Sequence, residues 1–229
     1  GTDALTLIGR AHELEHRLPY QPIIAALRDL LDHPQWPDLY KRIKGVLPSI
    51  WLAETARLLP ELLPHDPPSA APPDEARLWE GIRQFLTVVA SPVILFIDDL
   101  QWADSASLAL FGYLIRQSSS IFYLATMRPD EGQALTSLLH SLSRTGQLVR
   151  ILLQRLTPHD LESITQVLSP AYAYPLAQRL SQMSEGNPYV LAELVRHLRK
   201  HEILHPNGQV DLSALSASPL LPRSVYSFI

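Results

Sequence analysis

The chain has 229 residues, 46% of them apolar, no cysteine, and a formal net charge of −4. This length suffices for one large domain or two small ones, with a core that needs no disulfide or metal staple. Thiol catalysis and thiolate metal sites are excluded, and the charge balance indicates no nucleic-acid-binding surface. No apolar run approaches the ~20 residues of a membrane helix. We therefore expect no membrane contact and no direct nucleic-acid contact from this segment, and the absence of cysteine is compatible with a reducing cytoplasm.

The first 89 residues predict helices. Residues 1–17 hold a small apolar patch, interpreted as a turn, and an amphipathic helix that begins near Glu13. Apolar residues at helical spacing predict three helices, at 23–32, 39–46 and 50–63. A proline-rich loop at 64–73 then breaks the structure. Asp74 is placed to cap a further helix over 75–89.

Residues 92–104, with the sequence PVILFIDDLQWAD, are the most informative stretch of the chain. Their apolar run predicts a strand over 93–98 that is buried on both faces, as in parallel sheets. Asp98 and Asp99 come at its carboxyl end, where open α/β sheets keep their ligands. The string resembles the Walker B strand of P-loop NTPases, in which such acids serve Mg²⁺ and the attacking water. The alternative is a buried strand that ends in a solvated acidic turn.

The remaining chain alternates strands and helices and then becomes helical. Further strands are predicted at 121–126 and 148–153, and helices after Asp104 and at 134–143, 158–168, 174–183 and 188–203. Thr157, Pro158 and Asp160 stand at the N-cap, N1 and N3 positions of a near capping box. This order predicts an α/β fold with a parallel sheet and a carboxyl-terminal helical lid. We expect a core over 1–156, a lid over 157–205, and a linker to a following region over 206–229.

Several motifs, in this order along nearly the whole chain, resemble the AAA-type STAND ATPase domain of bacterial LuxR-type and maltose-activator-type regulators. They are Gly9-Arg10, LPYQPIIAALRDLL, RLWEGIRQFL, PVILFIDDLQWAD, FYLATMRPDE, LTPHDL and SEGNPYVLAELVRHL. The resemblance implies a P-loop NTPase sheet, ATP and Mg²⁺ as ligands, and a role as a nucleotide switch. It also implies a cytoplasmic location, other domains of a larger regulator as partners, and possible self-association.

The resemblance implies roles for single residues. Asp98 would be the metal-associated acid, Asp99 the water-orienting acid, and Arg128 the arginine that reads the γ-phosphate. Nucleotide contacts would come from Gly9 and Arg10 of the entry motif and from Gly186 and Pro188 of the lid. Trp102 and Asp104 match family positions without an assigned role.

Each of these residues also has a purely structural interpretation. Arg128 could pair with Asp130 or Glu131 in a surface bridge worth roughly 0–1 kcal/mol. Residues 186–188 could be only a helix stop and restart. The order of the motifs together favours the family.

One motif of the family is missing. A P-loop has the pattern GxxxxGK followed by Ser or Thr, and none of the nine glycines of this chain precedes a lysine. In the family a block with the first strand, the P-loop, its helix and the second strand would stand between Arg17 and Leu18. In the family, the first strand of this block lies between the strand that ends near Arg128 and the strand predicted here at 148–153. Without the block, these two strands would pair directly or keep open edges. A degenerate domain, a fragment and an omitted block are the three explanations left open.

We therefore expect an incomplete nucleotide-switch ATPase domain of a bacterial signalling or transcription regulator, poor in ATP hydrolysis as its sequence stands. Whether it is an enzyme is left open. The alternative is a non-catalytic protein-interaction scaffold that uses the open sheet as its docking face. A metal-dependent hydrolase is set aside, because no histidine stands at ligand spacing near the acids.

Overall fold

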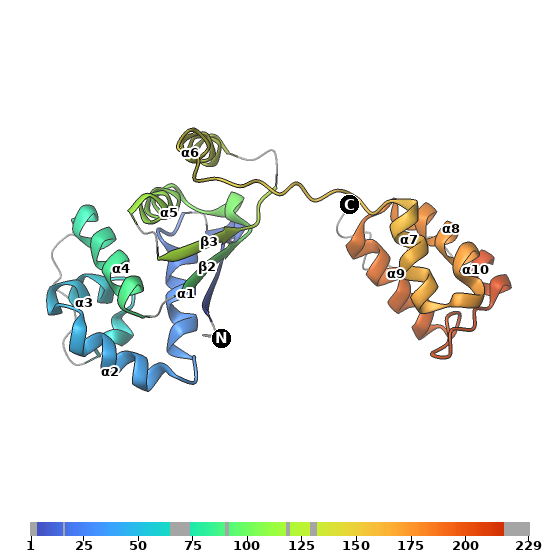
Figure 1. Cartoon of the computed structure of the whole chain (residues 1–229), viewed down its shortest axis with the longest axis horizontal. Coiled ribbons are helices and arrows are strands. Elements are labelled where there is room, and N and C mark those ends of the chain that lie inside the picture. Colours follow the sequence, from blue (N-terminus) through green and yellow to red (C-terminus); the bar gives the residue numbers. More distant parts are fainter. Residues whose placement is uncertain are drawn as a thin grey trace. The chain divides into compact units, whose positions relative to one another are not determined.

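The computed structural model describes residues 4–15, 17–64, 74–89, 92–117, 120–128 and 132–217. It divides into two compact units, Gly1–Val149 and Arg150–Ile229, which we describe one at a time (Figure 1). The expected proline-rich loop lies almost wholly outside the described residues. Within them, no helix is long and apolar enough to cross a membrane.

The first unit contains a three-stranded parallel sheet. Its strands are β1 (Leu5–Arg10), β2 (Val93–Asp98) and β3 (Ile121–Ala125), in the order β1-β2-β3. Together with the helices around it, this sheet confirms the predicted α/β class. The predicted turn at the amino terminus was wrong, because the alternating residues LTLIGR pair with β2 and bury every second side chain. Only a 3-10 helix, Glu13–Glu15, stands where a longer helix was expected.

The helices of the first unit follow the predicted spacing closely. They are α1 (Gln21–Leu31), α2 (Trp36–Val46), α3 (Ser49–Ala56), α4 (Glu75–Val89), α5 (Ser105–Gln117) and α6 (Gln133–Arg144), with short 3-10 helices at Pro60–Leu62 and Leu100–Trp102. The single helix expected over 50–63 is therefore α3 followed by a 3-10 turn. The 3-10 turn starts at Pro60, which has no N–H with which an α-helix could continue.

The core of this unit lies on one face of the sheet. Leu7, Leu95 and Ile97 are almost fully buried there, together with side chains of α1, α4 and α5. Helix α1 packs on β1 and β2, and α6 packs against α5. Figure 1 shows α5 between α6 and the rest of this unit. The opposite face, here called the outer face, carries Ile8, Ile94, Phe96, Phe122 and Leu124. Ile8, Phe122 and Leu124 are 50%, 62% and 47% exposed.

The strand predicted over 148–153 does not form. This segment is extended without strand pairing, and Val149, Ile151, Leu152 and Leu153 are all strongly exposed. An extended segment becomes a strand only where a neighbour supplies partners for its N–H and C=O groups. Within the described sheet β3 is one of the two edge strands and pairs only with β2. Of the two outcomes considered from the sequence, the structure shows the open edge.

The second unit is helical. It contains α7 (Pro158–Leu168), a 3-10 helix (Pro170–Tyr172), α8 (Ala173–Ser184), α9 (Pro188–Lys200) and α10 (Leu212–Ala217). The predicted cap of α7 is confirmed as a full capping box, in which Thr157 and Asp160 satisfy each other's backbone N–H groups. Residues 206–217, expected as part of a linker, fold with this unit, since Val210 and Leu215 are buried in its core.

Gly9 is a position where α1 meets the sheet too closely for a side chain. A Cβ there would lie 2.0 Å from the Pro22 carbonyl oxygen and 3.0 Å from Ile97 Cδ1. Gly9→Ala should therefore lower the free energy of unfolding by about 1–3 kcal/mol, measured by urea denaturation. Gly45→Ala is the control, because a Cβ at this position in α2 meets nothing within 4 Å and should stabilise by up to about 1 kcal/mol. Equal effects of the two substitutions would contradict the steric explanation.

Candidate functional site

The carboxyl ends of the three strands are joined through the carboxylate of Asp98. Arg10, the last residue of β1, donates from Nε to Asp98 Oδ2 at 2.9 Å, and its Nη2 lies 2.7 Å from the same oxygen. Thr126, which follows β3, donates from its hydroxyl to Asp98 Oδ1 at 2.5 Å. Parallel strands end at the same edge of a sheet, so these three side chains meet although they are far apart in sequence.

Asp99 turns the chain sharply at this edge. Its backbone has φ of 57°, in the left-handed region, and its N–H donates to Thr126 Oγ1 at 2.9 Å. Gln101 donates from Nε2 to Asp99 Oδ1 at 3.0 Å and accepts from the backbone N–H of Arg128 at 3.1 Å. The side chain of Gln101 therefore links the acidic turn to the segment after β3.

These contacts lower the pKa of Asp98 from its usual value of 3.8, mainly through the Thr126 hydroxyl and also through the Arg10 guanidinium, against the opposing effect of burial. The carboxylate thus stays ionised at neutral pH and is already neutralised by Arg10. The Arg10 side chain is 61% exposed, so solvent screens this ion pair.

Asp104 ties the LQWAD string to the LPYQP turn. Its Oδ1 accepts from the Ser107 backbone N–H at 2.9 Å, which caps α5. Its Oδ2 accepts from the backbone N–H of Tyr20 at 3.2 Å. Tyr20 is buried, lies in the left-handed region with φ of 65°, and immediately precedes α1. The role of Asp104 that the sequence left unassigned is therefore positional, because it fixes where α1 and α5 begin.

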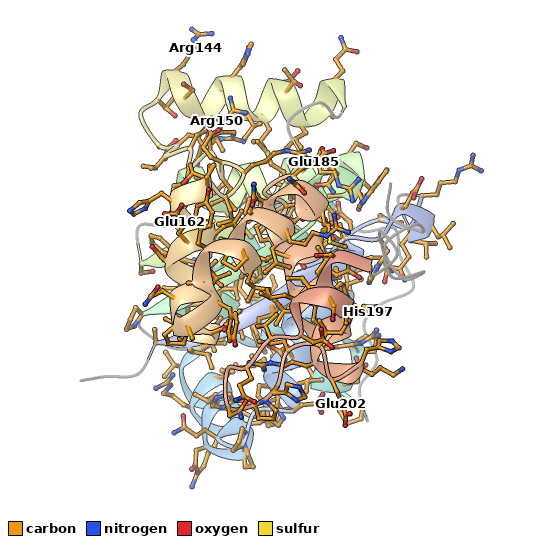
Figure 2. The ribbon with its side chains drawn as sticks, turned by 90° about the vertical axis from the view of Figure 1, so that its right-hand side faces the viewer. Arg144, Arg150, Glu162, Glu185, His197 and Glu202 are labelled. Carbon is orange, nitrogen blue, oxygen red and sulfur yellow. The ribbon has the colours of Figure 1, made fainter. Side chains whose placement is uncertain are left out.

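Gly186 and Pro188 belong to the second unit, at the turn between α8 and α9. A Cβ on Gly186, which has φ of 74°, would lie 2.4 Å from the Leu156 carbonyl oxygen, and Gly186 O accepts from Leu156 N–H at 2.8 Å. Asn187 caps α9 through Oδ1, and Pro188 takes the N1 position. Figure 2 labels Glu185 at this turn, whose carbonyl accepts from Arg155 at 2.9 Å. Within this unit the geometry is that of a helix stop and restart.

The acidic edge does not fit a magnesium site built from protein ligands alone. Mg²⁺ requires oxygen ligands in near-ideal octahedral geometry. Both oxygens of Asp98 already accept hydrogen bonds, one from Arg10 and one from Thr126. In the part of the chain that the structure describes, no three or more histidine or acidic side chains gather as a cation site. A cation at this edge would have to compete with the Arg10 guanidinium for the Asp98 carboxylate.

Four of the residues singled out from the sequence thus meet at one sheet edge: Gly9, Arg10, Asp98 and Asp99, with the backbone of Arg128 beside them. The exposed Arg128 side chain has its suggested partners, Asp130 and Glu131, outside the described residues. Sequence reasoning missed Thr126 and Gln101. A hydroxyl directly after an apolar strand and an amide inside the LQWAD string were the available signals.

Comparison with known proteins gives one match. A family model described as an AAA ATPase domain matches residues 1–127. No curated protein and no solved structure matches the chain.

The hydroxyl of Thr126 is expected to hold the pKa of Asp98 down. A carboxyl whose pKa is lower in the folded state stabilises the fold at pH values above its unfolded pKa, and this stabilisation is lost as the pH falls. Thr126→Val should therefore lower the free energy of unfolding by about 0.5–1 kcal/mol at pH 7 and by progressively less in acid. Urea denaturation at pH 7 and at acidic pH measures the free energy of unfolding, and an NMR titration of the Asp98 carboxyl measures its pKa. Thr87→Val removes a hydroxyl that bonds only Arg83 O on α4, and its cost should not depend on pH. An unchanged Asp98 titration in Thr126→Val would contradict the assignment.

Proposed function

The chain belongs to the AAA ATPase domain family, whose model covers 127 of its 229 residues, and from this premise we propose that it is a nucleotide-switch domain impaired in ATP hydrolysis. The family generally binds ATP and Mg²⁺. The observation that carries the proposal is the meeting of Arg10, Asp98, Asp99 and the Arg128 backbone at the carboxyl edge of a parallel sheet. Open α/β sheets bind their ligands at this edge.

The proposed impairment has two physical causes. No GxxxxGK string supplies backbone N–H groups and a lysine for the phosphates, which removes the main electrostatic stabilisation of phosphoryl transfer. The carboxylate of Asp98 is also engaged by Arg10 and Thr126. A cation that served the phosphates would have to displace Arg10 first.

The motif order supports a narrower proposal. We place the chain among the STAND ATPase domains of bacterial LuxR-type and maltose-activator-type regulators, with PVILFIDDLQWAD as the Walker B strand. Its partners would then be other domains of a larger cytoplasmic signalling protein, and Asp99 and Arg128 would serve the water and the γ-phosphate. Gly9, Arg10, Gly186 and Pro188 would contribute to nucleotide binding.

A non-catalytic interaction scaffold is the second candidate function. The uncovered outer face of the sheet favours it, because large exposed apolar patches in proteins mark interaction sites. This function needs neither a phosphate cradle nor a free carboxylate at Asp98.

For the chain as it stands, calorimetric titration with ATP and Mg²⁺ should show no binding tighter than about 1 mM, and phosphate release should stay at the buffer rate. Arg10→Ala frees the Asp98 carboxylate and should leave both results unchanged, since the phosphate cradle is still missing. Tight magnesium-dependent binding with turnover would contradict the proposed impairment.

Restoring the missing block tests the proposed family role directly. A strand, P-loop, helix and strand from an intact AAA ATPase domain, inserted between Arg17 and Leu18, should confer magnesium-dependent ATP binding and turnover. Asp99→Asn in this chimera should lower turnover at least about 100-fold while binding persists, since general-base assistance contributes 10²–10⁴-fold. A chimera with the P-loop lysine replaced by alanine is the control. Binding without Asp99-dependent turnover in a folded chimera would contradict the assigned role.

A further inference from the structure

The outer face of the sheet is a continuous apolar surface. The register places Ile8 beside Phe96 and Phe96 beside Leu124, while Ile94 lies beside Phe122. Successive residues of a strand point to opposite faces, so all five side chains share the face that the core does not use. The three on the outer strands are about half exposed or more, and the two on β2 are half-buried.

Each described helix of the first unit packs elsewhere. Helix α1 lies on β1 and β2 from the core side, α2 and α3 pack against α4, and α6 packs against α5. Parallel sheets are found almost only with helices on both faces, because their strands are apolar on both sides. The sheet of this unit is therefore half-covered, and the uncovered half has the composition of a buried surface.

We propose that the outer face is a docking surface for an amphipathic α-helix of another polypeptide. Three strands spaced ~4.8 Å apart present a surface about 10 Å wide between the outer strands. A helix with its side chains is about 10–12 Å across, so one helix covers this width. Strands of five and six residues are roughly 17–20 Å long, which matches three to four helical turns.

The size of the face argues against a second copy of this chain as the occupant. An aromatic side chain buries ~150–250 Å² when fully covered and the three aliphatic ones here bury less, so five partly exposed side chains offer at most roughly 400–500 Å². Stable protein dimers bury about 800 Å² on each partner. A single helix needs only a stripe of anchors at i, i+3, i+4 and i+7, which this face can supply with pockets between its strands.

Charge defines the partner further. At the carboxyl end of the outer face stands the ion pair of Arg10 and Asp98, which adds no net charge, and Thr6 lies on the same face near the other end. The helix that fits between these two ends of the outer face is apolar along one stripe and carries equal numbers of positive and negative charges elsewhere. The inference rests on the scaffold alternative, to which it adds the class of partner, and it requires no nucleotide.

The test uses a fluorescein-labelled synthetic helix of about 14 residues, with leucines at i, i+3, i+4 and i+7 and with glutamate and lysine in equal number on the other face. Fluorescence anisotropy should show saturable binding to the whole chain, and none for a scrambled peptide of the same composition. Phe122→Ser with Leu124→Ser should weaken the binding at least about tenfold, which is about 1.4 kcal/mol. Ile8→Ser, on the opposite strand of the same face, should weaken it independently.

Leu152→Ser with Leu153→Ser is the matched control. These side chains are 75% and 87% exposed but belong to no strand, so their loss removes as much apolar surface without altering the outer face. Circular dichroism verifies that each variant is folded. Equal binding by all variants, or no binding to the wild-type chain, would overturn the proposal. So would a dimer in light scattering that the Phe122 and Leu124 substitutions abolish. Because the titration contains no nucleotide, its failure would leave the nucleotide proposal standing.

Discussion

The hydrogen bonds of the Asp98 carboxylate are the contacts on which the carboxyl edge of the sheet depends. The carboxylate accepts from Arg10 at the end of β1 and from Thr126 just after β3, so one acidic side chain on the central strand joins all three strands. Asp99, Gln101 and Arg128 continue this network through the turn that follows. Without an ionised group at this position, the Arg10 guanidinium would lose its partner and no side chain of β2 would join the ends of β1 and β3.

The same contact is one of the two physical causes behind the impairment that we propose. In an AAA ATPase domain an acid at the end of this strand is available for the cation that accompanies ATP. In the proposed role Asp98 takes this place, and the Asp98 carboxylate is engaged by an arginine from the neighbouring strand, while the sequence contains no GxxxxGK string. An ion pair of this kind stabilises a sheet edge and at the same time lowers its affinity for a cation, because the two compete for one carboxylate.

The open sheet has consequences on two sides. At the edge, β3 has no second neighbour among the described strands, and the apolar segment around Ile151 stays extended and exposed. On the outer face, Phe122 and Leu124 keep about half of their surface or more in solvent. Both features are those of a parallel sheet that has fewer neighbouring strands and helices than its apolar side chains need for burial. The sheet therefore offers apolar surface that another chain could bury.

The class of the fold and most of its elements follow from the amino-acid sequence, because the periodicity of apolar residues and the capping of helices depend on neighbouring residues. Strand β2, helix α4 and the capping box at Thr157 were predicted residue by residue, and the string PVILFIDDLQWAD placed two acids at the carboxyl end of β2. The three-dimensional structure was needed to show that residues 5–10 form a strand and residues 148–153 do not, since a strand exists only where a neighbour pairs with it. It also decided that Arg10 neutralises Asp98 and that Asp104 holds Tyr20, because such contacts join residues more than 80 positions apart.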